Sequence, residues 1–152
     1  MPFLADAMLG KLARWLRILG FDTAYDPSLT DEAVIQKAKG EGRILLTKDS
    51  RLHKNASRSG AKSVLIKQDE NGGMLQEISP LLTDPSLGSR CPACNALLIL
   101  EDSRDPAPIT ARKNGPHWRC PSCGKLYWHG THWKGIMRTL VLAGLGDRIG
   151  NS

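Results

Sequence analysis

Two Cys-x-x-Cys pairs constrain this 152-residue chain more than any other feature of its sequence. The first pair is "CPAC", with Cys91 and Cys94, and the second is "CPSC", with Cys120 and Cys123. Each pair can present two thiolates from one tight turn, and two such turns supply the tetrahedral sulfur set that zinc prefers. We therefore predict a small zinc ribbon over residues 89–130. Four thiolates complete the coordination of the ion, so its predicted role is structural.

The same four cysteines have alternative interpretations: two disulfides, a redox dithiol, or an iron centre of rubredoxin type. The N-terminus lacks a basic region followed by an apolar stretch and a small-residue cleavage site, so we expect a cytoplasmic protein, in which disulfides are rare. A redox dithiol would need only one pair. No apolar run is long enough to cross a bilayer, and we expect no membrane partner.

The chain before the cysteines alternates strand-like and helix-like segments. Strands are predicted at "FLA", "FDTAY", "RILLT" and "KSVLIK", and helices at about residues 8–19, 31–42 and 74–82. The segment "KDSRLHKNASRSG" is predicted as a short polar helix or turn. Repeated strand–helix steps predict an α/β fold, a parallel sheet flanked by helices.

The composition then divides the chain. We place the α/β domain at residues 1–84 and read "TDPSLGSR", residues 83–90, as a linker because of its Pro, Gly and Ser content. After the ribbon, residues 131–152 are predicted to form a C-terminal helix, from about Trp133 to Leu145, and a frayed tail.

Three aspartates occupy positions where a parallel sheet binds ligands. Asp6 and Asp49 each follow an apolar strand, and Asp31 begins a predicted helix after Thr30. Ligands of open parallel sheets lie outside the carboxyl ends of the strands. Clustered carboxylates repel one another and need a cation, and Mg²⁺ or Mn²⁺ prefers such oxygen ligands. The alternative for each aspartate alone is a helix cap or a turn.

Basic residues suggest a polyanionic partner. Residues 1–88 hold 12 Lys and Arg against 11 Asp and Glu, whereas residues 89–152 hold 9 against 4. Basic segments favour nucleic acid, although a modest excess also serves solubility. The predicted RNA contacts are one flank of the first helix and two residues near the second cysteine pair: Lys11, Arg14, Arg17, Arg119 and Lys125.

Aromatic residues surround the second cysteine pair, in "HWRC" and "LYWHGTHW". Aromatic and basic side chains together can stack on and neutralise single-stranded RNA. The alternative, which we favour for Trp128 and Trp133, is that these rings pack the ribbon against the rest of the protein. We expect His117, His129 and His132 to be surface or nucleic-acid contacts because the sulfur set is already complete.

Nearly the whole chain resembles one family of PIN-like RNases, the C-terminal RNase domain of the Mut-seven exoribonucleases, in which a zinc ribbon follows a PIN-like domain. The resemblance lies in "FLADAMLGKLARWLRILGFDT", "DEAVIQKAKGEGRILLTKD" and the cysteine pairs with "YWHGTHW". It implies that Asp6, Asp31 and Asp49 bind the catalytic metal. Many PIN nucleases carry a fourth acid; the corresponding position here is Arg51, and Asp69 is a candidate substitute.

The expected function is Mg²⁺- or Mn²⁺-dependent hydrolysis of single-stranded RNA, with the zinc ribbon aiding RNA binding. The alternative is a non-catalytic RNA-binding or ribosome-associated adaptor that uses the ribbon and a relict acidic pocket. Divalent-metal-dependent cleavage would separate the two.

Overall fold

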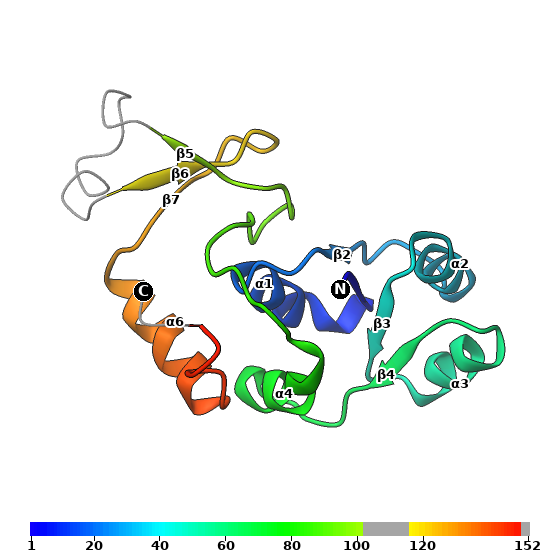
Figure 1. Cartoon of the computed structure of the whole chain (residues 1–152). Coiled ribbons are helices and arrows are strands. Elements are labelled where there is room, and N and C mark those ends of the chain that lie inside the picture. The colour runs from blue at the N-terminus through cyan, green and yellow to red at the C-terminus, as the bar shows by residue number, and fades with distance from the viewer. Residues whose placement is uncertain (102–115, 150–152) are drawn as a thin grey trace.

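A computed structural model describes residues 1–101 and 116–149, and its larger part is an α/β sheet (Figure 1). The strands of this sheet are β1 (Phe3–Ala5), β2 (Thr23–Tyr25), β3 (Ile44–Thr47) and β4 (Ser63–Leu65). All neighbouring strands are parallel, in the order β2-β1-β3-β4. The predicted α/β class is confirmed.

Helices lie on both faces of the sheet. They are η1 (Ala7–Leu9), α1 (Gly10–Ile18), α2 (Asp31–Glu41), α3 (Ser50–Arg58), α4 (Asn71–Glu77), η2 (Ser79–Leu81) and α6 (Thr131–Leu142). Figure 1 shows β3 and β4 between α1 and α4 on one side and α2 and α3 on the other.

The strand order creates a switch point between β1 and β3. From β1 the chain passes through α1 to β2 on one side, and from β2 it returns through α2 to β3 on the other side of β1. The connections that leave β1 and β3 therefore run to opposite faces and open a crevice between the carboxyl ends of these strands. Open α/β sheets bind their ligands at such a crevice.

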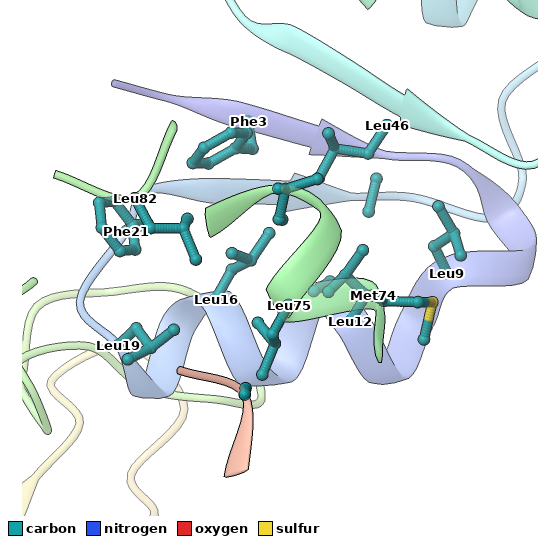
Figure 2. Close-up of a cluster of buried hydrophobic side chains, with 14 of the residues drawn as sticks. Phe3, Leu9, Leu12, Leu16, Leu19, Phe21, Leu46, Met74, Leu75 and Leu82 are labelled. Carbon is teal, nitrogen blue, oxygen red and sulfur yellow. The ribbon is translucent and has the colours of Figure 1, made fainter. Parts of the chain in front are cut away.

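Two apolar layers sandwich the sheet because side chains alternate along each strand. Phe3 and Leu46 face the layer formed with α1 and α4, which Figure 2 shows with Leu12, Leu16 and Leu75 packed beneath the strands. Other strand residues face the layer formed with α2 and α3; these are Leu4 and Leu45, which pack with Val34, Leu52 and Ala56. All of these residues are buried.

Element boundaries differ from the sequence prediction in two places. The helix expected at residues 74–82 begins earlier, at Asn71, and ends at Glu77. Pro80 lacks an N–H and cannot continue the α-helical hydrogen bonds, so the chain forms η2 there instead. The C-terminal helix ends at Leu142, before Gly144 with its φ of 78°. The polar segment after β3 is a helix, α3.

The predicted linker is packed against α1. Its backbone N–H groups at Ser86 and Gly88 donate to the carbonyls of Leu19 and Ile18, at 2.9 and 2.8 Å. Gly20, with a φ of 92°, allows this close approach, because a Cβ there would lie 2.2 Å from the Ser86 carbonyl oxygen. The segment is therefore a docked part of the fold.

A second sheet follows, formed by β5 (Ile99–Glu101), β6 (His117–Arg119) and β7 (Leu126–Trp128). Its neighbours are antiparallel, in the order β5-β6-β7. After β7, α6 returns to the first layer, where Leu140, Ala143 and Leu145 are buried with the α1 and α4 side chains. Parts of the predicted ribbon and tail, residues 102–115 and 150–152, lie outside the described residues. Within the described residues, no helix has the length and apolar character needed to span a bilayer.

Candidate functional site

The four cysteines lie together beside the antiparallel sheet. Their sulfur atoms are all within 4.8 Å of one another. Cys91 Sγ lies 3.7 Å from Cys123 Sγ, and Cys94 Sγ lies 3.3 Å from Cys120 Sγ. A disulfide would require about 2.05 Å, and the thiols are free. Zinc–sulfur bonds of about 2.3 Å in a tetrahedron place the sulfurs about 3.8 Å apart. The cluster therefore fits a zinc ion.

The surroundings of the thiols shift their pKa values in opposite directions. Burial alone would raise the pKa of Cys91 and Cys120, but hydrogen-bond donors outweigh it: the Tyr127 hydroxyl, 3.1 Å from Cys91 Sγ, helps to lower the pKa of Cys91, and backbone N–H groups lower the pKa of Cys120 to about 6. At Cys123 the backbone N–H of Lys125 lowers the pKa, but burial and the other thiols raise it to about 11. A cation among the sulfurs would stabilise all four thiolates, the form that binds metals.

The first cysteine turn is attached to the α/β sheet by Arg17. This side chain is only 6% exposed. Its Nε donates to the Thr23 carbonyl at 2.9 Å, and its Nη1 donates to the carbonyls of Pro92 and Ala93, both at 3.1 Å. Helical periodicity had placed Arg17 on an exposed flank for RNA. That placement is wrong because the ribbon covers this part of α1, so Arg17 joins the two parts of the protein.

Asn95 makes a second attachment at the edge strand β2. Its Oδ1 accepts from the Thr23 backbone N–H at 3.0 Å, and its Nδ2 donates to Asp22 Oδ1 at 2.7 Å. Arg43 also donates to Asp22, at 2.9 Å. Burial alone would raise the pKa of Asp22, but hydrogen bonds from Arg43 and Asn95 hold it below the ordinary value. Asn95, which follows Cys94 in the chain, thus connects the Arg43–Asp22 ion pair of the α/β domain to the first cysteine turn.

Asp6 and Asp49 meet at the switch point through Thr47. Asp6 directly follows β1, and Thr47 is the last residue of β3. The buried Thr47 hydroxyl donates to Asp6 Oδ2 at 2.8 Å and accepts the Asp49 backbone N–H at 3.0 Å. The Asp6 backbone N–H also donates to the Leu46 carbonyl at 2.9 Å. The structure therefore places both predicted aspartates at the switch point between β1 and β3, joined by Thr47.

Both aspartates also cap helices. Asp6 Oδ1 accepts from the Ala7 N–H at 2.8 Å at the start of η1. Asp49 Oδ1 accepts from the N–H groups of Arg51 and Leu52, at 2.9 and 3.2 Å, at the start of α3. Capping fixes the orientation of each carboxylate. It does not exclude metal binding, because a carboxylate has two oxygens with two lone pairs each.

Asp31 lies on a third element, α2. It is exposed in the first turn of α2, after Thr30, whose Oγ1 accepts from the Ala33 N–H at 3.2 Å. Within the described residues, the cysteines form the group of three or more possible metal ligands whose donor atoms lie within 4.8 Å of one another, and no carboxylate group does so. The three aspartates are thus not assembled as a compact ligand set. Asp6 and Asp49 fit Mg²⁺ or Mn²⁺ in another way, since such ions are held by one or two carboxylates and keep several waters.

The residues near the predicted fourth acid are ion-paired or exposed. Asp69, after β4, accepts a hydrogen bond from Lys48 Nζ. This contact lowers the pKa of Asp69. Arg51 is exposed on α3. Lys48 directly follows β3, so its ion pair holds Asp69 near the carboxyl end of that strand. Both residues line an open pocket of about 420 Å³ with Lys11 and Tyr25.

Of the remaining residues predicted to contact RNA, three are exposed to solvent and one is hydrogen-bonded within the ribbon. Lys11, Arg14 and Lys125 are exposed. Arg119 donates to the carboxylate of Glu101 and to the Gly124 carbonyl, so it also holds the ribbon together.

The three histidines near the second cysteine pair differ in their exposure to solvent. His129 and His132 are exposed, as expected. His117 is buried, with its Nε2 3.2 Å from Glu101 Oε2. The prediction of a surface histidine at 117 is wrong, because the side chain is covered and lies against the Glu101 carboxylate of the neighbouring strand β5.

Sequence reasoning missed Thr47, Lys48 and Asn95. Thr47 carried a usable signal, a hydroxyl residue at the end of a buried strand two positions before an aspartate. Asn95 follows the first cysteine pair and adopts a φ of 76°, which Asn tolerates better than most residues. Their hydrogen bonds join segments distant in the sequence, so local pattern alone did not reveal them.

Comparison with known proteins agrees with this architecture. The model of the Mut7-C RNase domain family matches residues 1–140, and the chain belongs to this family. It is also similar to the human "Exonuclease mut-7 homolog", with 35% identity over 107 residues. That alignment covers 66% of this chain and 12% of the human protein. No solved structure gives a significant match.

Proposed function

We propose that the protein is a metal-dependent ribonuclease that hydrolyses phosphodiester bonds in single-stranded RNA. The observation that carries the proposal is the convergence of Asp6 and Asp49 on Thr47 at the switch point between β1 and β3. Membership of an RNase domain family supports it. The human relative is named an exonuclease, and this chain spans about an eighth of that protein's length.

In this proposal, one oxygen each from Asp6 and Asp49 holds Mg²⁺ or Mn²⁺. When bound, the ion would stabilise the charge that develops on the phosphate and lower the pKa of a coordinated water. The Thr47 hydroxyl holds the Asp6 carboxylate in place. Asp31, at the N-terminus of α2, acts through a water in this scheme. Lys11 and Arg14 on the exposed flank of α1 hold the RNA phosphates.

The proposed division of labour follows the predicted boundaries. Residues 1–84 form the nuclease domain, residues 89–130 form a ribbon held by zinc at Cys91, Cys94, Cys120 and Cys123, and residues 131–152 brace the nuclease domain. Arg119 and Lys125 add positive charge on the ribbon for RNA. We propose a cytoplasmic location, where the thiols remain reduced.

A second candidate is a non-catalytic RNA-binding adaptor. It is favoured by the capping bonds of Asp6 and Asp49 and by the finding that, within the described residues, no three carboxylates form a compact ligand set. In that case the carboxylates serve the fold alone.

Asp6→Asn and Asp49→Asn distinguish the two candidates. Asn caps helices about as well as Asp, and an amide at position 6 can donate to the Thr47 oxygen in place of accepting from its hydroxyl. Both variants should therefore stay folded, with wild-type zinc content and at most a modest fall in melting temperature. Each should lose several kcal/mol of transition-state stabilisation, about a hundredfold or more in cleavage rate. Asp147→Asn, in the exposed C-terminal tail, is the matched control. Wild-type cleavage rates in the two site variants would contradict the proposal.

A further inference from the structure

An aromatic pocket lies between the ribbon, α1 and α6. Its volume is about 170 Å³, and its walls include Arg14 and Ile18 from α1, Trp118 and Trp128 from the ribbon, and Trp133 and Ile136 from α6. Three separate parts of the fold thus build it. An apolar cavity of about 150 Å³ accepts a benzene ring, so this pocket has room for one flat ring system.

One wall of the pocket is a stack of three rings. His129 lies over Trp133, with ring centroids 3.7 Å apart and planes 7° apart. On its other side, His129 lies 4.9 Å from Trp118, with the planes 26° apart. Partial loss of solvent contact around the His129 ring, with a smaller effect from His132, lowers the pKa of His129. The stack is a rigid aromatic surface of the kind on which unpaired bases stack.

The charged side chains that line the pocket are basic. Arg14, Arg90 and His132 line it, and none of its described lining residues is acidic. The Arg90 guanidinium is held by the carbonyls of Gly20 and Asn95, at 3.3 and 3.0 Å. Arg14 is exposed at the rim. An apolar ring carrying a negative phosphate is the ligand that matches these walls.

Shared lining residues relate the aromatic pocket to the carboxyl edge of the sheet. A shallow hollow of about 200 Å³ shares Arg14 and Ile18 with the aromatic pocket. The same hollow shares Lys11 and Asn71 with the open pocket at the carboxyl edge of the sheet, which begins at Ala7, next to Asp6. The three hollows follow one another along α1, and we refer to them together as the groove; exposed Lys11 and Arg14 line it. Lys11 and Ile18 are seven positions apart, about 10 Å of helix.

We propose that this aromatic pocket binds one unpaired base of the RNA strand whose backbone follows the groove to the Asp6 and Asp49 crevice. The inference deepens the proposed function and rests on it for the direction of the strand. Arg14 contacts the phosphate of the bound nucleotide, and the ring stack holds its base. The ribbon thereby sets the register between a captured base and the phosphate at the crevice.

The direct test compares two uncleavable oligomers on the zinc-loaded full chain without Mg²⁺ or Mn²⁺. One is a 2′-O-methyl oligouridylate, and the other has the same backbone without bases. Fluorescence anisotropy of an end label gives both dissociation constants. Base stacking should make the abasic oligomer bind about 5- to 150-fold more weakly. Equal binding of the two oligomers overturns the inference.

Substitutions in the pocket test whether the preference for the base-containing oligomer arises there. Trp133→Ala should reduce the preference for the base-containing oligomer, Trp133→Phe should retain most of it, and Arg14→Ala should weaken both oligomers. Arg58→Ala, on exposed α3, is the matched control for charge. Melting temperature and zinc content report folding. If Trp133→Ala misfolds, the wild-type comparison of the two oligomers still decides.

Binding and cleavage separate this inference from the proposed function. Base-dependent binding that Trp133→Ala removes supports the pocket even when wild-type protein cleaves no RNA. Conversely, cleavage that depends on Asp6 and Asp49, with binding unchanged in Trp133→Ala, retains the ribonuclease and overturns the pocket.

Discussion

The buried Thr47 hydroxyl connects Asp6 and Asp49 through two hydrogen bonds. Its hydrogen is directed to Asp6 and its lone pair receives the Asp49 N–H. A threonine at the end of a central strand therefore fixes the distance between two loops that leave the sheet on opposite faces. This role is structural in the first place, and under the proposed function it also sets the position of the metal ligands.

Replacing Thr47 with Val tests that role. Valine keeps the shape but leaves the Asp6 carboxylate and the Asp49 N–H without their shared partner, which should cost about 1–3 kcal/mol of unfolding free energy. Thr47→Ser keeps the hydroxyl and should lose only about 1 kcal/mol for the missing methyl group. Urea unfolding measures both. A Val variant more stable than the Ser variant would contradict the hydrogen-bonding role.

At the scale of elements, α1 serves three surfaces at once. Leu12 and Leu16 face the core, Lys11 and Arg14 face solvent, and Arg17 faces the first cysteine turn. The 3.6-residue period of a helix fixes these directions. It does not say which surfaces another element will cover, and for that reason the sequence predicted Arg17 as exposed.

Arg17→Met should weaken the attachment of the ribbon. The variant keeps much of the side-chain volume but leaves the carbonyls of Thr23, Pro92 and Ala93 without their donor, at a cost of about 2–4 kcal/mol in unfolding free energy. Zinc should also be lost at a lower chelator concentration, because the turn that bears Cys91 and Cys94 is less well held. Arg14→Met is the control on the same helix. Identical unfolding and zinc retention in the two variants would contradict this assignment.

Particular residues show what sequence can and cannot predict. The apolar runs before Asp6 and Asp49 predicted strands with acids at their carboxyl ends, and the cysteine spacing predicted the cluster, because both are local patterns. The contacts of Arg17, Thr47 and Asn95 join residues 6 to 76 positions apart. Such contacts depend on how elements pack, so the docked linker and the link between Asp6 and Asp49 through Thr47 required the structure.

At the scale of the whole molecule, the ribbon and α6 are both packed against the α/β sheet. The first cysteine turn holds Thr23 of β2 through Asn95 and Arg17. After the second turn, α6 supplies Leu140 to the apolar layer under the sheet. Loss of metal at the cysteines should therefore reach the α/β sheet by both routes.

Hydrogen exchange after zinc removal tests this coupling. A chelator should unfold the ribbon, since four-cysteine sites fold with their metal. The account predicts that amide protection also falls at Thr23 and Ser86, whose N–H groups bond Asn95 and the Leu19 carbonyl. Amides of β3 and α3, on the far side, should change less. Loss of protection confined to residues 89–130 would contradict the coupling.

The proposed function requires that the crevice at Asp6 and Asp49 cleaves RNA with a divalent ion. The most direct measurement is single-turnover cleavage of end-labelled single-stranded RNA by zinc-loaded protein as Mn²⁺ or Mg²⁺ is added. We expect cleavage that rises with the ion and is lost in both Asp6→Asn and Asp49→Asn, while Asp147→Asn remains active. Tight RNA binding with no cleavage at any ion concentration would contradict it and favour the adaptor.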